Sequence, residues 1–304
     1  MDKSLIDINS KIQTALNNNK SVVALESTLI SHGLPYPHNI KVAQESINAV
    51  EASGSISATI GVINGRIKVG LNKDEINILA ESNNIEKVSR HNLAIALNNK
   101  INAATTVAST MYIASNIGIK FFATGGIGGV HLNAKNTFDI SADLTELSKT
   151  TMYVVCSGAK TILDLDKTFE KLETLGISRI GFNTDFMPGF YYYQTNKRVD
   201  HNYKKIDTLN DYLKTREKID QQGSVLLFNP VPKNKAIEKT IIEKWIKDSV
   251  KKANINLIEG KNLTPYLLTE IARLSNNKTL EANMELIINN ARVAGQIAVN
   301  YYKI

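Results

Sequence analysis

The stretch that decides the fold is TMYVVCSGAKTILD, which runs from Thr151 to Asp164. Its apolar run, Met152 to Cys156, has the length and composition of a buried strand. Ser157-Gly158-Ala159 then predicts a tight turn, and the residues from Thr161 onward have the spacing of an amphipathic helix. A strand that passes directly to a helix is typical of α/β folds. Lys160 stands at that corner, either as a solvated lysine at the start of a helix or as an amine that faces a site.

Strand-like and helix-like segments alternate along most of the 304 residues, which favours a layered α/β fold. Further strands are predicted at SVVALE (21–26), ISRIGF (177–182) and SVLLF (224–228). The helix predicted over 161–175 carries one apolar face, formed by Ile162, Leu165, Phe169 and Leu172. Asn64-Gly65 lies between two short apolar runs and predicts a hairpin, so we expect a mixed sheet.

The chain has no internal repeat and no linker rich in Pro, Gly and Ser, so we expect one domain over residues 1–304. Within it, residues 1–19 are interpreted as an N-terminal helix. Residues 191–222 are polar, rich in Tyr and Lys, and weakly patterned. They are interpreted as a possible lid or surface excursion.

Composition excludes several classes of protein. Hydrophobic residues make up 43% and charged residues 21%, as in ordinary globular proteins. The net charge of +7 is scattered, without the basic stripe interleaved with aromatics that nucleic-acid binding favours. The single cysteine, Cys156, leaves no intrachain disulfide to form. No segment has the pattern of a signal peptide or a membrane span, so we expect a cytoplasmic protein with no nucleic-acid or membrane partner.

The first stretch that carries chemistry is ALEST, residues 24–28. Glu26 ends an apolar strand, and ligands bind at strand ends in open α/β sheets. A carboxyl group that is partly desolvated there has a raised pKa and can donate a proton. A cap or an ion-paired carboxylate is the structural alternative.

The second stretch is FATGGIGGVHLNAKNTFDISADL, residues 122–144. Its four glycines, at 125, 126, 128 and 129, predict a sharp turn whose amides could approach an anion, although the spacing matches no nucleotide-binding motif. Asp139 and Asp143 follow, four residues apart. The two carboxylates could hold a hard divalent cation through oxygen and water. Equally, they could be an N-cap and a first-turn acid at the start of a helix.

Other residues are ambiguous when each is taken alone. A lysine in a dry site can act as a nucleophile toward a sugar carbon, but most lysines, Lys87 and Lys160 included, simply solvate a surface. Asn283 lies early in an apolar-periodic helix, where capping is the usual task of asparagine. His131 follows the glycine turn and could touch a ligand. Cys156 is interpreted as a small buried apolar residue.

Together these stretches resemble the pseudouridine-5'-phosphate glycosidase family, also called indigoidine synthase A-like. The matching segments run in family order over residues 20–300 and are ALESTLISHGLPYPHN, ATIGVINGRIKVGL, KVSRHNLA, ATTVASTM, FATGGIGGVH, DISADLTEL, VVCSGAKTILD, LETLGI, FNPVP, GKNLTPYLL and LEANMELIINNA. In FMPGFYYYQTNKRVD, Gly189 stands where the family pattern often has alanine, and the three tyrosines that follow are unusual.

The resemblance implies a three-layer α/β/α sandwich with a mixed central sheet, a homotrimer, and one Mn²⁺ per subunit. It implies that Glu26 is the proton donor, that Lys160 is the covalent nucleophile and that Asp139 takes part in binding the metal. It further implies that the substrate is contacted by Lys87, Val107, Ser141, Ala142, Asp143, His131 and Asn283. The implied reaction is the reversible cleavage of pseudouridine 5'-phosphate to uracil and ribose 5-phosphate.

That chemistry explains the residue types. A C-glycoside has no heteroatom leaving group, so the two carboxylates of an ordinary glycosidase would not suffice. A Schiff base between Lys160 and C1' of the sugar would supply an electron-accepting centre. The turn of small residues before Lys160 is expected to leave room for the sugar. Two alternatives remain from the residues alone: another Schiff-base lyase or aldolase acting on a sugar phosphate, and a catalytically idle nucleotide-binding protein.

Overall fold

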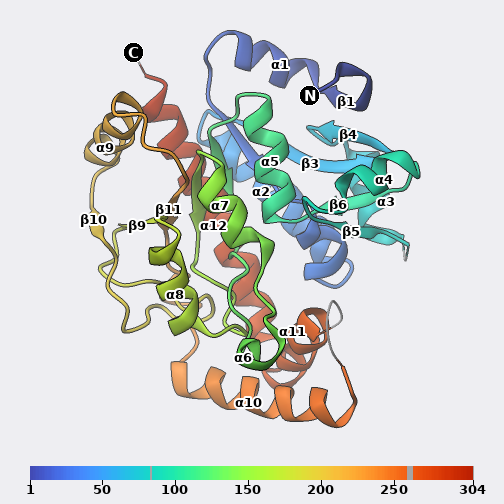
Figure 1. The fold of residues 1–304 in the computed structure, drawn as a ribbon, viewed down its shortest axis with the longest axis vertical. Helices are drawn as coiled ribbons and strands as arrows, with labels where there is room; N and C mark the ends of the chain where they lie inside the picture. The colour runs from blue at the N-terminus through green and yellow to red at the C-terminus, as the bar shows by residue number, and fades with distance from the viewer. Residues whose placement is uncertain (83, 259–262, 304) are drawn as a thin grey trace.

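The computed structural model describes residues 1–82, 84–258 and 263–303, and a central β-sheet runs through them with helices on both faces (Figure 1). Seven strands form its parallel part, in the order β3-β2-β7-β8-β11-β9-β10. Their bounds are β2 Val22–Leu25, β3 Ile56–Ile63, β7 Phe121–Ala123, β8 Tyr153–Cys156, β9 Ser178–Phe182, β10 His201–Tyr203 and β11 Val225–Phe228.

The strand β3 takes part in both parallel and antiparallel pairing. Its first half pairs parallel with β2, and its second half pairs antiparallel with β4 (Arg66–Val69) and β6 (Ala103–Thr105). The strands β1 (Ile6–Ile8) and β5 (Glu86–Val88) extend this part of the sheet. The predicted hairpin at Asn64-Gly65 is confirmed, and both residues have the positive φ that a two-residue connection of this type requires. The prediction of a mixed sheet is therefore confirmed.

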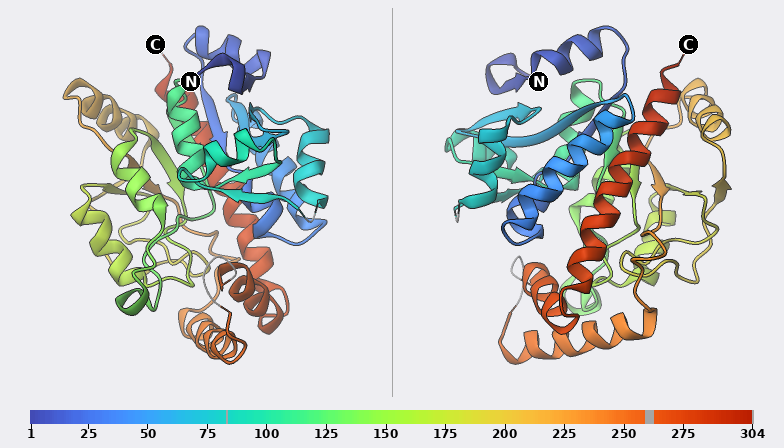
Figure 2. Two further views of the ribbon diagram at one scale, coloured as in Figure 1. Left: turned by 45° about the vertical axis from the view of Figure 1, so that its right-hand side comes forward. Right: turned by 180° about the vertical axis from the view of Figure 1, so that it is seen from behind.

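Helices cover both faces of the sheet, which gives the predicted three layers. One face carries α2 (His38–Ala52), α9 (Ile206–Lys218) and α12 (Lys278–Tyr301), as the view from behind shows (Figure 2). The other carries α5 (Val107–Asn116), α7 (Ala142–Lys149) and α8 (Leu165–Thr174). The remaining helices are α1 (Ser10–Asn17), α3 (Lys73–Glu81), α4 (Leu93–Asn98), α6 (Ala134–Thr137), α10 (Lys239–Ile255) and α11 (Leu263–Leu274).

Alternate side chains of each central strand enter different parts of the core. In β8, Val154 and Cys156 belong to the cluster around α5 and α7, whereas Tyr153 and Val155 pack with residues of α12. All four side chains are almost fully buried, as expected for a strand covered on both faces. Burial raises the pKa of the Cys156 thiol to about 12, which confirms its interpretation as a small buried apolar residue.

Two segments differ from the sequence-based expectation. In residues 1–19 the helix covers only 10–17, because Ile6–Ile8 pairs with β4 as a strand. In residues 191–222, β10 extends the sheet and α9 packs on α12, so these two parts of the segment belong to the layers and are not a surface excursion. Tyr191 and Tyr192 are buried as well.

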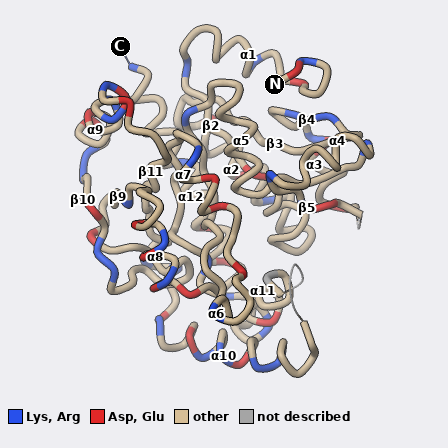
Figure 3. The backbone as a smooth tube through the Cα atoms, viewed as in Figure 1, with Lys and Arg blue, Asp and Glu red and all other residues tan. Residues whose placement is uncertain are grey.

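Charged residues are distributed widely over the fold. Figure 3 shows Lys and Arg on many elements, and along α10 they are interleaved with Asp and Glu. None of the helices in the described ranges combines the length and apolar composition that crossing a membrane requires.

The hairpin yields a first prediction. A Cβ at Gly65 would lie 2.6 Å from both Leu97 O and Lys100 Cα, and the φ of Gly65 is +72°. We expect Gly65→Ala to lower the free energy of unfolding by about 3 kcal/mol, since backbone strain and collision add. Gly176→Ala is the matched control, because Gly176 has a φ of +67° but open space around it. In urea denaturation, Gly176→Ala should lose only about 1 kcal/mol of the free energy of unfolding. Equal losses would show that collision contributes nothing.

Candidate active site

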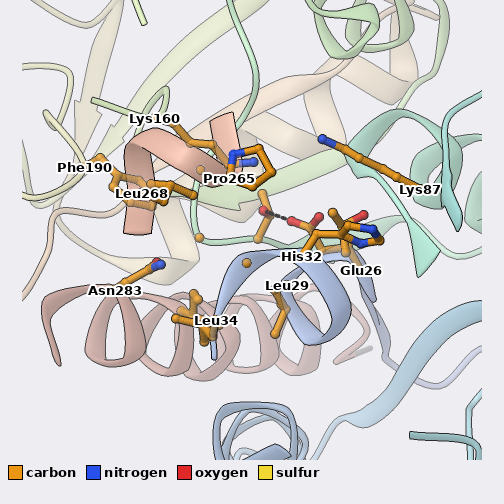
Figure 4. Close-up of a pocket in the computed structure, with 16 residues that line it drawn as sticks. Glu26, Leu29, His32, Leu34, Lys87, Lys160, Phe190, Pro265, Leu268 and Asn283 are labelled. Atoms are coloured by element: carbon orange, nitrogen blue, oxygen red, sulfur yellow. Dashed lines mark hydrogen bonds between the residues drawn. The ribbon is translucent and has the colours of Figure 1, made fainter. Parts of the chain in front are cut away.

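The candidate site lies at the carboxyl ends of the parallel strands, where Glu26 follows β2, Thr124 follows β7 and Lys160 follows β8. Parallel neighbours end at the same edge of a sheet, so these residues converge although they are far apart in the chain. Figure 4 shows Lys160 and Lys87 extending from opposite sides toward the space beside Glu26.

Two connected cavities meet at this point. The inner cavity has a volume of about 50 Å³, and Asn283 and Phe190 are among the residues that line it. The second, which we call the histidine cavity because His91 and His131 line it, has a volume of about 520 Å³. The two share Glu26, Thr28, Lys87 and Lys160. Every site residue predicted from the sequence lines at least one of them: Glu26, Lys87, Val107, His131, Asp139, Ser141, Ala142, Asp143, Lys160 and Asn283.

Glu26 is buried, with only 5% of its surface exposed. Burial raises its pKa, and this effect outweighs the nearby charge of Lys160 and the hydrogen bond that the Thr124 hydroxyl donates to its Oε1. The residues after Glu26 are anchored to β6, because Ser27 Oγ accepts from Thr105 N at 2.9 Å. A buried carboxyl with a raised pKa holds its proton and can donate it.

Lys160 lies on a loop and not at the start of a helix, which corrects the sequence-based expectation. The helix α8 begins at Leu165, with Asp164 as its N-cap. Residues before the cap are held instead by the glycine loop: Ala159 bridges to Ile127, and Lys160 N donates to Ile127 O at 3.1 Å. These tertiary bonds override the helical spacing of the segment.

The small residues before Lys160 serve packing, and they do not leave room for a ligand. Ser157 and Ala159 are almost fully buried. Gly158 has a φ of +87°, and a Cβ there would lie 2.3 Å from Pro188 O. The backbone conformation and this close approach both require glycine at that position. The turn therefore fixes the direction in which Lys160 leaves the sheet.

Lys87 lies on β5 and reaches the site from the opposite side (Figure 4). Desolvation lowers the pKa of its amine, and repulsion by Lys160 lowers it further, against the attraction of Asp143 and Glu26. Lys87 is an exposed residue, as the solvated-surface interpretation predicts, and it also lines both cavities.

Two helices direct their N-termini into the histidine cavity. The first residues of α5 and α7, Val107 and Ala142, both line it. Helix N-termini carry partial positive charge and unpaired amides, a combination that suits an anion such as phosphate.

Asp143 links these helices to the glycine loop. It is 7% exposed, and its carboxylate accepts hydrogen bonds from Ala108 N at 3.0 Å and Gly128 N at 2.8 Å. Ser141 is the N-cap of α7, so Asp143 is a first-turn acid, as one of the two interpretations predicted. Asp139 precedes the cap by two residues and is not part of it. Each Asp143 oxygen accepts one backbone amide, so this carboxylate joins the start of α5 to the glycine loop.

Asp139 has a different neighbour. Its Oδ2 lies 3.6 Å from Nδ1 of His131, and burial lowers the pKa of that histidine. Within the described part of the chain, no three Asp, Glu, His or Cys side chains gather closely enough to hold a metal ion. A cation here would therefore depend on Asp139 together with oxygen ligands that are not side chains.

The glycine loop is constrained by crowding, not by an unusual backbone. None of its four glycines has a positive φ. A Cβ at Gly128 would lie 2.2 Å from Ser141 Oγ, and one at Gly126 would lie 2.6 Å from the Phe190 ring. The expected sharp turn is thus a place of close approach between the loop and its neighbours.

Asn290 was not predicted as a site residue. It is fully buried on α12, and its amide donates to Thr124 O at 2.8 Å and to Ser157 Oγ at 3.1 Å. Its carbonyl accepts from Asn229 Nδ2 at 2.9 Å. A signal was present in the sequence, because Asn290 falls at helical spacing on the same face as Leu286 and Ala294.

Comparisons with known proteins agree over nearly the whole chain. The family model described as indigoidine synthase A like protein matches residues 11–300. The pseudouridine-5'-phosphate glycosidase of Brachyspira hyodysenteriae is 48% identical over 302 residues, which cover 98% of this chain and 97% of that protein. The protein of the same name from Staphylococcus aureus is 44% identical over 299 residues, with coverage of 98% and 97%.

Solved structures give the same result. The prealnumycin C-glycosynthase AlnA, in complex with ribulose 5-phosphate, superposes with a TM-score of 0.91 at 34% identity, and the match covers 99% of this chain and 98% of that one. An indigoidine synthase A-like protein from Thermotoga maritima gives a TM-score of 0.89 at 32% identity, with coverage of 98% and 97%.

The buried carboxyl yields a second prediction. The pKa of Glu26 is raised in the folded protein. The contribution of Glu26 to the free energy of unfolding is therefore fully present at low pH, where this carboxyl is protonated, and is lost as the pH rises through that pKa. Gln cannot ionise, so we expect Glu26→Gln to be more stable than the wild type at pH 8 and the difference to shrink toward pH 4. Urea denaturation across this range measures it.

Glu270→Gln is a control of opposite sign. Arg273 and Lys252 lower the pKa of Glu270 to about 2. Its contribution is therefore present at neutral pH and lost only as the pH falls toward 2, so Glu270→Gln should be less stable than the wild type at pH 8. A Glu26→Gln profile that follows the Glu270→Gln profile would contradict the assignment of a raised pKa.

Proposed function

The chain belongs to the family of indigoidine synthase A-like proteins, and we propose that it is a pseudouridine-5'-phosphate glycosidase. It reversibly cleaves the C–C glycosidic bond of pseudouridine 5'-phosphate to give uracil and ribose 5-phosphate. The relatives that carry this name cover nearly the whole chain. The observation that carries the proposal is the convergence of a buried carboxyl, Glu26, with two amines, Lys87 and Lys160, in one inner cavity.

Lys160 is the nucleophile in this proposal. Its amine bonds to C1' of the ribose while the ring C1'–O4' bond breaks, and O4' takes a proton to become a hydroxyl. The nitrogen lone pair then forms an iminium at C1' as the bond to uracil C5 breaks, and C5 takes a proton. Addition of water to the iminium releases ribose 5-phosphate and restores the amine. Glu26, whose pKa is raised by burial, is the proton donor for these steps.

The histidine cavity binds the sugar phosphate in this scheme. The N-termini of α5 and α7, with Val107, Ser141 and Ala142, offer amides and a hydroxyl to the phosphate. Lys87 adds a positive charge between the two cavities. Asp143 contributes by holding Gly128 and Ala108 in position, since amides occupy its carboxylate.

Asn283 and His131 contact opposite ends of the substrate. Asn283 is 8% exposed and directs its amide into the inner cavity (Figure 4). An amide offers both a donor and an acceptor, which match the imide edge of uracil. His131 lines the histidine cavity beside Asp139 and faces the sugar phosphate.

Asp139 takes part in binding Mn²⁺ in this proposal. An open carboxylate fits a hard cation whose other ligands are water and substrate oxygens, which is a common arrangement for divalent ions at phosphate sites. The ion supplies positive charge near the phosphate. A homotrimer and a cytoplasmic location complete the proposal, and light scattering on the purified protein tests the assembly.

The function is tested by mixing the protein with uracil and ribose 5-phosphate and following pseudouridine 5'-phosphate by chromatography and mass. We expect product in the presence of Mn²⁺. After chelation, or in Asp139→Asn, we expect the rate to fall by about tenfold or more. Lys247→Met controls for loss of charge away from both cavities. No product in either direction would refute the function, whereas an unchanged rate after chelation would refute only the metal.

The nucleophile is tested by borohydride reduction in the presence of ribose 5-phosphate. We expect a single pentose phosphate adduct on the peptide that contains Lys160, because reduction fixes the iminium. Lys160→Ala should lose the adduct and at least about 10³-fold in kcat. Lys87→Met, which removes the neighbouring amine, should keep the adduct at Lys160. An adduct that persists in Lys160→Ala would assign the nucleophile elsewhere.

A further inference from the structure

A third cavity continues the inner cavity on the side away from the histidine cavity. It has a volume of about 660 Å³ and lies between the segment 31–35, α11 and α12, so we call it the α11 chamber. It shares with the inner cavity His32, Gly33, Leu34, Pro265, Leu268 and Asn283. No described residue lines both the α11 chamber and the histidine cavity. The three spaces therefore lie in series, with Glu26 and Lys160 lining the middle one.

The two outer spaces differ in charge. The histidine cavity receives Lys87, Lys160 and two helix N-termini. In the α11 chamber, the guanidinium of Arg273 is bound to Glu270, with Nη2 2.6 Å from Oε1. Burial lowers the pKa of His32, which favours its neutral form. Much of the remaining lining is uncharged, with Thr269, Asn276, Asn277 and Thr279 as polar groups.

This contrast in charge predicts that the two halves of the substrate bind in different cavities. A phosphate dianion is favoured beside lysines and helix N-termini, whereas the guanidinium that lines the α11 chamber, Arg273, already donates to Glu270. A neutral heterocycle with donors and acceptors suits a chamber of hydroxyls and amides. Asn283, which lines both the inner cavity and the α11 chamber, can contact such a ring on either side of the junction.

We propose that uracil enters and leaves through the α11 chamber, while the sugar phosphate uses the histidine cavity. The proposal rests on the function proposed above. Its consequence is that the base departs while the pentose phosphate is still an iminium on Lys160, and that another uracil can take its place. In the return step the C5–H proton is lost as C5 bonds to C1', and the iminium electrons return to nitrogen.

Order of addition tests the separate routes. Enzyme preloaded with ribose 5-phosphate is mixed with labelled uracil, and product is measured by rapid quench. We expect product to form without a lag, because the sugar phosphate does not block the α11 chamber. A lag whose rate constant equals that for release of ribose 5-phosphate would overturn the proposal, since it would mean that both substrates share one mouth.

A second test narrows the chamber. Ala272 lies on α11 and lines the α11 chamber alone, so Ala272→Trp should raise KM for uracil by tenfold or more and leave KM for ribose 5-phosphate unchanged. Ala94→Trp makes the same change on α4, beside an unrelated cavity, and should alter neither constant. Equal effects on both substrates, or no effect on uracil, would overturn the route.

Two further measurements keep the outcomes distinct. Borohydride trapping of ribose 5-phosphate reports that Ala272→Trp is folded. If that variant does not trap the sugar, Thr269→Trp, which fills the same chamber from an exposed position, replaces it with the same expected result. Wild-type protein that makes no pseudouridine 5'-phosphate would refute the function, and the route with it. If the wild type is active but shows a lag that matches the release of ribose 5-phosphate, only the proposed route is refuted.

Discussion

One buried side-chain amide, that of Asn290, links the turns on which the candidate site is built. Asn290 of α12 forms hydrogen bonds with residues that follow β7, β8 and β11. These three strands are neighbours in the sheet, although long stretches of chain separate them in the sequence. The same turns carry Thr124, which contacts Glu26, and Gly158, which aims Lys160. An unsatisfied buried amide or carbonyl costs about 1–3 kcal/mol, so the network tolerates only a side chain with a donor and an acceptor in these directions. Asn290 therefore joins the turn that carries Thr124, beside the acid, to the turn that precedes the amine.

Electrostatics in the inner cavity follow from that placement. Glu26 is buried and desolvation raises its pKa, while desolvation lowers the pKa of Lys87, which lines the same cavity. Burial thus favours the protonated form of Glu26, which is the form that can donate a proton. The helix N-termini of α5 and α7 add partial positive charge outside the inner cavity, in the histidine cavity. The polarity of the lining therefore changes from the inner cavity to the histidine cavity.

Short-range patterns in the sequence predicted the layers, the hairpin at Asn64-Gly65 and the strand ends that carry Glu26 and Lys160, because these depend on neighbours in the chain. The site residues that the family resemblance implied all line one pair of cavities. The predictions that were wrong concern residues whose positions depend on contacts with distant parts of the chain. The start of α8 moved to Leu165 because bridges to the glycine loop hold the preceding residues. A Cβ at Gly189 would lie 2.1 Å from the Tyr192 ring, so the two departures from the family pattern belong together.

The position of α12 after every other described element has a consequence for how the enzyme is made. Glu26 and Lys160 are synthesised well before Asn283 and Asn290, and β9 can join the sheet only after β11 has appeared, since β11 lies between β8 and β9. Until the ribosome has delivered α12, the nascent chain carries Glu26 and Lys160 without the Asn290 amide that bonds to Thr124 and Ser157. The inner cavity can therefore be completed only late in synthesis, because Asn283 and Ile287 of its lining arrive with α12.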